Sequence, residues 1–418
     1  MVERLLYRRD KRAKRKKADF TRFSASVLVL LGTCESAAAA LALSVALSKA
    51  AMGRELSWKK FYAGEGGFFW DRWTNARCCS VLHMTRKNIA KISEAFIHPA
   101  LQFAWPERYR LDQHGTWHLF LRNRGRVSLL EITCVFFARF ANAGKYELLA
   151  PLLGGFHWSR YKLVFKDTLD AVVARWVGCG LHDISKVPLN AAGWTHGARD
   201  TFAAWAAAIW RQAGASPRVV GFIDGTFRTV CKPEGDDWIQ RLLYNGYEGT
   251  HGLKYQSLCV PCGLIFDMYG PVVGSCADST ILAMSGLEAK LADISARAGW
   301  HAIAYADSAY SGSDHILRGC KRHMIFCEEH RQAQTAMNGV RTSVEWGFGI
   351  AAMDWPWVKV RDVHKVKLSP CGLYFKVATI LTNIKTCLVG GNLISDYFDL
   401  EPPTLAQYLA IAPEPPNQ

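Results

Sequence analysis

Apolar side chains are spaced differently in the two halves of this chain. Helical spacing marks residues 128–143 and 200–217, and the second segment ends in Gly, Ser and Pro. From residue 218 onward, short apolar runs are bounded by Gly, Pro and Asp. These runs predict strands at 218–227, 252–261, 263–273 and 301–310. Strands followed by helices predict an α/β layer after a helical N-terminal part.

The C-terminal half also contains segments with helical spacing. Helices are expected at 278–299, 342–353 and 370–391, the last of which ends at a Gly. Residues 358–368, "VKVRDVHKVKL", alternate apolar and basic side chains. This alternation predicts a strand with one basic face, or a plain solvated edge. The Pro-rich tail from Pro402 is expected to be loose.

Two helical segments are joined by a Gly-rich turn. Residues 145–153, a "GGF" break and residues 157–176 have this form. One interpretation is a helix-turn-helix that places Trp158, Arg160 and Lys162 in a DNA major groove. The other is a helical hairpin inside a bundle, which the pattern alone favours. Both stay open at this point.

An apolar segment at residues 25–52 needs a separate interpretation. Its basic start and Ala-rich run are typical of a signal peptide or a membrane anchor. Glu35 interrupts the run near its middle, and an ion there is costly in lipid. We therefore expect a buried helix and no membrane partner, with a membrane-anchored enzyme as the alternative. Residues 55–124 are aromatic and show no clear period.

The composition is that of a globular protein with a basic excess. Half of the 418 residues are apolar, 21% are charged and the formal net charge is +15, which excludes a largely disordered chain. Residues 1–22 hold ten Lys and Arg against three acids, so 10 − 3 = +7 of that charge belongs to a basic arm. This balance predicts a polyanionic partner such as nucleic acid. Residues 8–17 also have the composition of a nuclear import signal, which predicts a nuclear protein.

The thirteen cysteines are scattered and odd in number, which favours a reducing compartment over a disulfide framework. "CVPC" at 259–262 is expected to close a turn between strands. Cys320, His323, Cys327 and His330 have zinc-like spacing. They would fall along one helix, which does not wrap a tetrahedral ion easily, so zinc is the disfavoured interpretation.

Three acids stand in apolar surroundings, unlike solvated surface residues. Asp224 interrupts the run "GFIDGTF", where Asp-Gly signals either a hairpin turn or a carboxylate on a buried strand. Asp307 ends an expected strand, and Glu345 lies in an expected helix. Asp307 could instead cap a helix, and Glu345 could pair with Arg341 four residues earlier.

Converging carboxylates repel one another, and a pair of divalent cations would remove that repulsion. Oxygen ligands suit Mg²⁺ or Mn²⁺, which in turn bind phosphate oxygens. Two such ions support phosphoryl transfer. The acids therefore predict a metal-dependent enzyme acting on phosphodiesters.

Several motifs, in order along the chain, resemble Harbinger-type DDE transposases and their domesticated relatives. The resemblance runs from about Arg218 to Leu409. Its motifs are "DGTFR", "QRLLYNGYEGTHGLKYQSLCVPCGLIFDMYGPVVGSCADSTIL", "YADSAYSG", "VRTSVEWGFG" and "PPTLAQYL". The resemblance implies a ribonuclease H-like core, an α/β mixed sheet flanked by helices.

The resemblance also implies which residues act. It assigns Asp224, Asp307 and Glu345 as catalytic ligands of two Mg²⁺ or Mn²⁺ ions. Thr226 is expected to orient Asp224 through a local hydrogen bond. Asp278 follows Ala277 where relatives often have a His-Asp pair, so it is expected to support the ligands or to cap the helix, a role that Ser279 could also fill.

The function expected is a metal-dependent DNA endonuclease and strand transferase, with a domesticated DNA-binding protein without cleavage as the alternative. Duplex DNA is the expected partner, and recognition of terminal inverted repeats stays open. A separate Myb-like DNA-binding protein and a homodimer stay open. Further phosphate contacts are expected from Lys254, Arg341, Lys359, Arg361, Lys365 and Lys367. The expected divisions are a basic arm at 1–22, a helical and aromatic region at 23–127, a helix-turn-helix-like region at 128–217, the nuclease domain at 218–400 and a tail at 401–418.

Overall fold

The computed structural model describes residues 68, 70–121, 125–155, 157–188, 197–235, 237–320 and 327–412, without the side chain of Asp362. The basic arm and the apolar segment at 25–52 lie outside the described residues. Two compact units are distinguished. One comprises residues 1–69 and 145–161, and the other comprises residues 70–144 and 162–418. Each unit is described by itself.

The larger unit begins with short helices and a small sheet. Its helices are α4 (Asn75–Leu82), α5 (Arg86–Ile92) and α6 (His98–Ala104), with a π-helical turn at Ser93–Ile97 before α6. Strands β1 (Tyr109–Leu111), β2 (Trp117–Phe120) and β3 (Arg126–Ser128) form an antiparallel sheet. Strands of three or four residues are too short to show a period of two, which is why no strand was expected here.

The helix expected at 128–143 is confirmed as α7, Leu129–Ala141, capped by the Ser128 side chain. Nearly all of α7 is buried, and its aromatic residues reach the end of helix α14 (Glu328–Asp354). Phe137 contacts Trp355 edge to face, and the Arg139 guanidinium lies over the Trp357 ring. The helical segment 70–144 is therefore built into the same body as the sheet.

The smaller unit contains the Gly-rich turn. Its first helix is α8, Tyr146–Leu149, continued by a 3-10 turn at Ala150–Leu153 that carries a Pro in its first positions. Gly154 and Gly155 both have positive φ, and α9 (Trp158–Val172) follows. The first helix is thus shorter than expected, because Pro151 cannot continue the α-helical hydrogen bonds. The helix-turn-helix interpretation stays a prediction.

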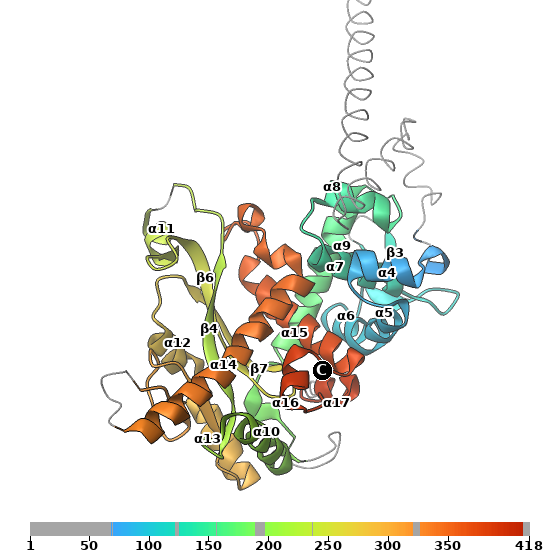
Figure 1. Cartoon of the computed structure of the whole chain (residues 1–418). Coiled ribbons are helices and arrows are strands. Elements are labelled where there is room, and N and C mark those ends of the chain that lie inside the picture. Colours follow the sequence, from blue (N-terminus) through green and yellow to red (C-terminus); the bar gives the residue numbers. More distant parts are fainter. Residues whose placement is uncertain are drawn as a thin grey trace, which may run out of the picture. The chain divides into compact units, whose positions relative to one another are not determined.

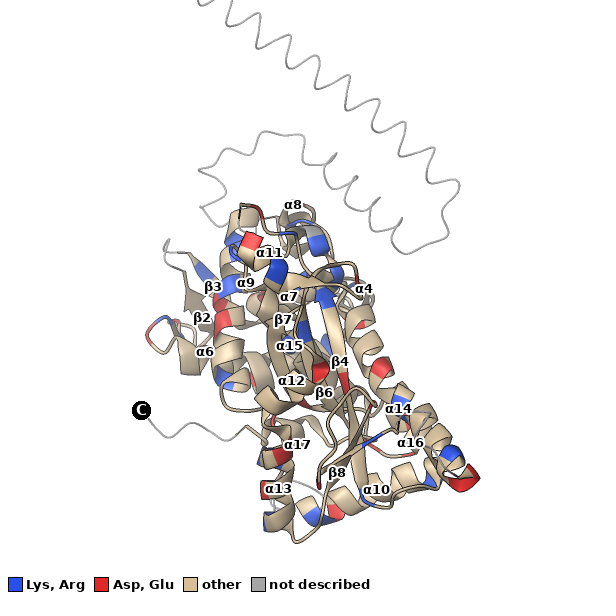
Figure 2. Ribbon diagram, turned by 90° about the vertical axis from the view of Figure 1, so that its left-hand side faces the viewer, with Lys and Arg blue, Asp and Glu red and all other residues tan. Residues whose placement is uncertain are grey.

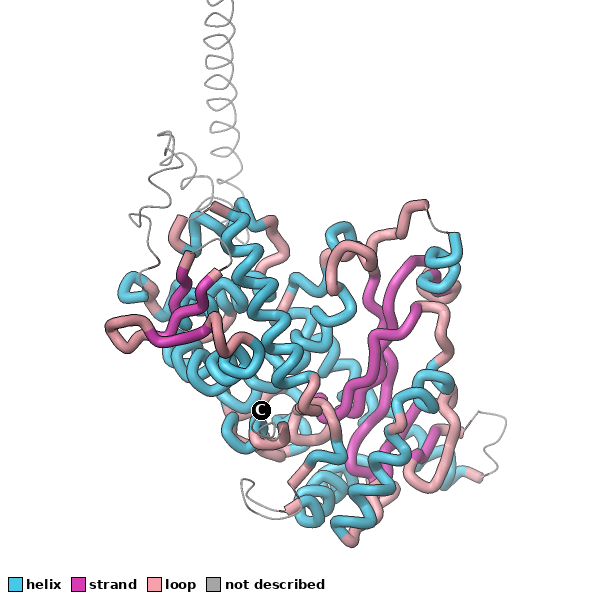
Figure 3. The backbone as a smooth tube through the Cα atoms, turned by 180° about the vertical axis from the view of Figure 1, so that it is seen from behind, coloured by secondary structure: helices cyan, strands magenta, loops and turns pink. Residues whose placement is uncertain are grey.

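A mixed sheet forms the centre of the larger unit (Figures 1 and 3). Strand β6 (Thr250–Cys259) lies between β7 (Ile265–Val273) and β4 (Val219–Thr229), antiparallel to both. Strands β8 (Ile303–Ala306) and β9 (Ile316–Arg318) extend it parallel to β4. The short β5 (Tyr244–Asn245) pairs with the first residues of β6. All four expected strands are confirmed, and the three-residue β9 was missed.

The hairpin interpretation of Asp224 and Gly225 is wrong. Both residues lie inside β4, where they pair with Ser257 and Gln256 of β6. The expected turn at 259–262 is confirmed, because Gly263 and Leu264 bond back to Val260 between β6 and β7. Every cysteine in the described ranges is free.

Helices cover both faces of the sheet. On one face lie α12 (Asp278–Ser285) and α13 (Leu287–Ala298), and Lys290 of α13 bonds the buried Asp267 of β7 at 2.8 Å. On the other face lie α14 and α15 (Cys371–Val389), and α14 crosses in front of β4 in Figure 1. The helix expected at 278–299 is two helices, because Gly286 adopts the left-handed conformation.

Two expectations for the C-terminal segments are wrong. Residues 358–368 form no strand: 3-10 turns at Pro356–Lys359 and Arg361–Val363 bond locally, since Trp357 and His364 are both anchored on Tyr374 of α15. The tail is ordered through residue 412. It follows α16 (Leu393–Phe398) and includes α17 (Leu405–Leu409), whose buried Tyr408 accepts a hydrogen bond from Asn383.

The helix expected at 342–353 is the second half of α14, which spans 27 residues. Gly347 does not break it and lies where the helix passes Cys259 of β6, whose Sγ would be 3.5 Å from a Cβ at this position. The helix expected at 200–217 is α10 (Ala198–Ala213), which packs on β4 and α14 and ends at Gly214. A short α11 (Asp237–Leu243) precedes β5.

Candidate active site on β4, β8 and α14

Asp224 and Asp307 are brought side by side by the pairing of two parallel strands. Ile223 of β4 is the register partner of Ala306 of β8, and the next residue on each strand is an aspartate. β8 ends at this point while β4 continues. Two acids separated by more than eighty positions in the sequence therefore share one edge of the sheet.

Asp307 also organises the turn that follows it. One of its carboxylate oxygens accepts hydrogen bonds from the Ser308 hydroxyl at 3.0 Å and from the Ala309 N–H at 3.2 Å. Residues 308–310 form a turn and not a helix, so the helix-cap alternative is wrong. The bonds orient Asp307 while leaving its other oxygen available for a ligand.

The Asp224 carboxylate is largely buried and faces the layer of α14. It accepts a hydrogen bond of 2.8 Å from the Gly225 N–H and one of 3.0 Å from Nη1 of Arg341. Burial raises the pKa of Asp224, and the nearby Glu345 raises it further, while Arg341 and the Gly225 N–H lower it. The net effect is upward, so this carboxylate lacks part of the cationic compensation that a buried anion needs.

Arg341 connects Asp224 with Glu345. Its Nη2 lies 3.7 Å from Oε1 of Glu345, one helical turn further along α14. The expected pairing of Glu345 with Arg341 is therefore present, but it is weak, because the Glu345 side chain is 56% exposed. The Arg341 side chain is only 15% exposed. Its guanidinium thus supplies the positive charge between two of the three expected ligands.

Residues 223–383 match the family model described as DDE superfamily endonuclease. The match begins on β4 one residue before Asp224, ends within α15 and includes all three acids. No curated protein and no solved structure matches the chain. This stretch of the larger unit is therefore similar to DDE superfamily endonucleases.

Tyr310 is a residue of the matched segment that the sequence analysis did not single out. Its ring is buried, and its hydroxyl has no hydrogen-bond partner in the described structure. Burial raises the pKa of this phenol, as do the carboxylates of Asp278, Asp224 and Asp307. The available signal was its place three residues after Asp307 in "YADSAYSG".

Gly225 of β4 lies next to both Asp278 and Tyr310. A Cβ at this position would lie 3.1 Å from Oδ1 of Asp278 and 3.5 Å from the Tyr310 hydroxyl. Asp278 itself bonds Nζ of Lys254 at 2.9 Å, and its expected capping role is wrong because Ala277 is the N-cap of α12. Asp278 and Lys254 therefore form an ion pair next to Gly225, the residue that follows Asp224.

The other residues expected to take part are placed separately. Thr226 lies on β4, whereas Gly225 and Arg341 donate the hydrogen bonds described above to the Asp224 carboxylate. Trp158 and Arg160 lie in the smaller unit, and Lys162 follows them on α9. The remaining cationic residues expected to contact phosphate are exposed: Lys359, Arg361, Lys365 and Lys367. Figure 2 shows that basic positions are spread over many elements. Their roles stay predictions.

Among the described residues, no three His, Cys, Asp or Glu side chains form a cluster that could hold a metal ion. The assignment of Asp224, Asp307 and Glu345 as ligands stays a prediction. His323, one of the four residues of the zinc interpretation, lies outside the described residues. The described part of the chain also contains no helix long and apolar enough to cross a membrane.

Proposed function

We propose that this protein is a metal-dependent DNA endonuclease and strand transferase of the Harbinger type, with a ribonuclease H-like core. The observation that carries the proposal is the register of β4 and β8, in which Ile223 and Ala306 pair and Asp224 and Asp307 follow. The strand order β7-β6-β4-β8-β9, with helices on both faces, supports the proposed fold.

Asp224, Asp307 and Glu345 fit divalent cations by their chemistry. All three offer carboxylate oxygens, the ligands that Mg²⁺ and Mn²⁺ prefer. The raised pKa of Asp224 and the presence of Arg341 beside it support a position that requires positive charge. Two such ions, when bound, would activate the attacking oxygen and stabilise the leaving oxygen of a phosphodiester.

The surrounding residues hold these carboxylates in position. The Gly225 N–H holds one oxygen of Asp224, and the Ser308–Ala309 turn holds one oxygen of Asp307. The reaction proposed is in-line attack of water on a DNA phosphodiester, which frees a 3′-hydroxyl that then attacks a second strand. The protein's part is to position these groups, since phosphoryl transfer needs little covalent help.

The basic excess supports DNA as the partner. The net charge of +15 attracts phosphates, and exposed lysines and arginines follow α14 in the chain. The basic segment at 8–17 supports a nuclear protein. Trp158, Arg160 and Lys162 are proposed as further DNA contacts. A Myb-like partner and a homodimer remain proposals without structural support.

A second candidate is a domesticated DNA-binding protein that does not cleave. The position of Arg341 favours it, because its guanidinium already offsets part of the charge of Asp224 and contacts Glu345. Intact carboxylates at all three positions favour the nuclease. The two candidates differ in one measurable property, which is strand cleavage.

The deciding experiment is nicking of supercoiled plasmid by the full-length chain with Mg²⁺ or Mn²⁺. We expect nicking that Asp307→Asn reduces at least a hundredfold, because the amide is a poor ligand for a hard cation. Asp314→Asn is the matched control, since Asp314 is exposed in the loop before β9. Undiminished nicking by Asp307→Asn contradicts the assignment, and DNA binding without any nicking by the wild type selects the second candidate.

A further inference from the structure

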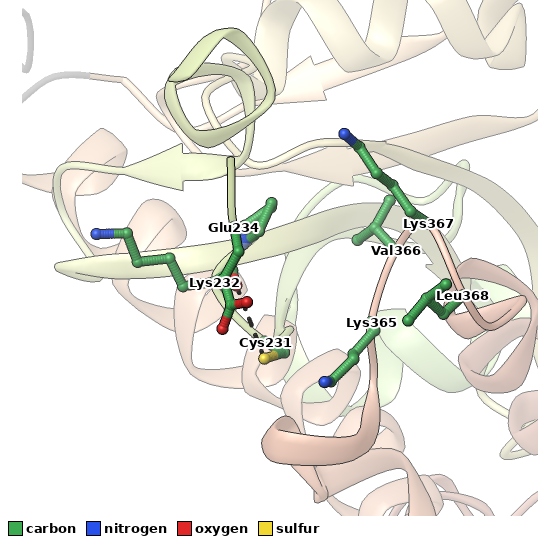
Figure 4. Close-up of a pocket in the computed structure, with 8 residues that line it drawn as sticks. Cys231, Lys232, Glu234, Lys365, Val366, Lys367 and Leu368 are labelled. Carbon is green, nitrogen blue, oxygen red and sulfur yellow. Dashed lines mark hydrogen bonds between the residues drawn. The ribbon is translucent and has the colours of Figure 1, made fainter. Parts of the chain in front are cut away.

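A pocket lies beyond the end of β4, away from the three acids (Figure 4). Residues 231–234 form one side and residues 365–368 form the other, around about 210 Å³. The Cys231 N–H bonds the His364 carbonyl at 3.0 Å, which joins the two segments at the base. The walls therefore come from two parts of the chain that are held together by a backbone hydrogen bond.

The pocket is separate from the candidate active site. Asp224 and Thr229 are five residues apart on β4, which corresponds to about 17 Å of strand. Cys231 lies two residues further on. A ligand in the pocket would thus not touch the carboxylates, although it would lie along the same strand.

The lining combines positive charge with apolar surface. Lys232, Lys365 and Lys367 surround the opening, and Figure 4 shows their side chains pointing in different directions around the rim. Between them lies apolar surface that includes Leu368, whose side chain is 80% exposed. A phosphate alone would be bound by the lysines and would leave this apolar surface in water.

Glu234 narrows the choice of ligand further. Its carboxylate, in the same pocket, repels a bare phosphate but can accept a hydrogen bond from the amino group of a base. A nucleotide offers both parts, because its phosphate suits the lysines and its base suits the apolar surface and the acceptor. In duplex DNA the base faces are covered by stacking, so only an unpaired nucleotide presents them.

Exposed aromatic side chains continue from the pocket onto α11. The side-chain amide of Gln240 bonds the Pro233 carbonyl at 2.8 Å, which ties α11 to the pocket wall. Trp238, on the same helix, is 68% exposed, and Tyr244 and Tyr247 beyond it are also exposed. Exposed aromatics beside lysines are the arrangement that binds single-stranded nucleic acid by stacking and charge.

We propose that this pocket and the aromatic residues of α11 and β5 bind unpaired nucleotides of single-stranded DNA. The inference rests on the proposed function only in taking DNA as the substrate. At 3.4 Å per stacked nucleotide, the 17 Å of β4 from Asp224 to Thr229 corresponds to about five nucleotides, and the pocket at Cys231 lies beyond that distance. The pocket would thus hold a strand that is unpaired near the cleavage point.

The test is binding of the full-length chain to a fluorescein-labelled 20-residue oligothymidylate and to a 20-base-pair duplex. Anisotropy is measured in EDTA, so that cleavage does not interfere. Trp238→Ala should raise Kd for the single strand roughly tenfold through lost stacking, while Kd for the duplex changes less than twofold. Trp210→Ala is the matched control, because Trp210 is also partly exposed but lies on α10.

The contribution of charge is tested by salt. Lys232→Ala with Lys365→Ala should lower the slope of log Kd against log salt by about 1.4 for the single strand, because each phosphate contact contributes about 0.7. Lys91→Ala, an exposed lysine of α5, should leave the slope unchanged. Thermal melting of each variant checks that it is folded.

Folded pocket variants that bind the single strand within twofold of wild type overturn the inference. Equal losses for single strand and duplex also overturn it, because they indicate a duplex backbone contact. Asp307→Asn should bind the single strand normally. If that variant nicks DNA like wild type while Trp238→Ala loses single-strand binding, the proposed function fails and this inference stands.

Discussion

Arg341 donates a 3.0 Å hydrogen bond to the carboxylate of Asp224, although 117 residues separate the two in the chain. The bond places a guanidinium where a carboxylate is buried and where its pKa is raised. The same guanidinium also lies 3.7 Å from Oε1 of Glu345, whose side chain is 56% exposed to solvent. Arg341 thus compensates in part for the charge that the proposed metal ions would neutralise.

Removal of Arg341 should destabilise the protein in EDTA. Arg341→Ala leaves the Asp224 carboxylate buried with one fewer donor, so we expect the free energy of unfolding to fall by about 1–2 kcal/mol at pH 7. Addition of Mn²⁺ should then raise Tm more for the variant than for wild type, because the cation would replace the lost charge. Thermal melting with and without Mn²⁺ measures both effects.

The control for this variant is Arg297→Ala. Arg297 pairs with Asp293 on α13, but both side chains are well exposed, so its loss should change the free energy of unfolding by less than about 0.5 kcal/mol. An Mn²⁺ effect that is equal in wild type and Arg341→Ala would argue against Asp224 as a metal ligand.

Ionised Asp224 should lower stability near neutral pH. Its folded pKa lies above the ordinary value of 3.8, so the folded state binds more protons than the unfolded state as pH rises past that value. Stability linked to this group is therefore present at low pH and is lost as pH rises through the folded pKa. In EDTA, Asp224→Asn should have a higher Tm than wild type at pH 7, and the difference should shrink toward pH 4.

Thermal melting at each pH gives Tm for wild type and variants. Asp314→Asn is the exposed control, and its Tm difference from wild type should not change with pH. A Tm advantage of Asp224→Asn that grows as pH falls would contradict the direction of the pKa shift. Metal ions must be absent throughout, because bound cations would favour the ionised form.

Gly225 should tolerate no side chain. The added methyl of Gly225→Ala would lie 3.1 Å from Oδ1 of Asp278, a tight contact that requires this carboxylate to shift, so we expect a loss of about 1–3 kcal/mol. Gly349→Ala is the matched control. It sits within α14 with open space around it and should instead stabilise the protein by about 0.5–1 kcal/mol, because alanine favours the helix. Urea unfolding curves of the two variants compare them, and equal signs would refute the packing argument.

The spacing of apolar residues was sufficient to predict most helices and strands. It failed where one spacing is compatible with two structures. The apolar runs located β4, β6, β7 and β8, and helical spacing located α7, α10 and α15. Residues 358–368 alternate like a strand, yet they turn locally because buried Trp357 and His364 are their anchors. Alternation alone does not specify a neighbouring strand with which to pair.

The sequence by itself determined that Asp224, Asp307 and Glu345 stand in apolar surroundings within a recognisable order of motifs. Only the tertiary structure decided that β4 has a partner on each side, which turns Asp224-Gly225 from a turn signal into the middle of a strand. Only the tertiary structure placed Arg341 on Asp224, Lys254 on Asp278 and Tyr310 among the acids. The physical reason is that side-chain spacing records each residue's own exposure, whereas these contacts depend on the register between strands and on the packing of a helix across them.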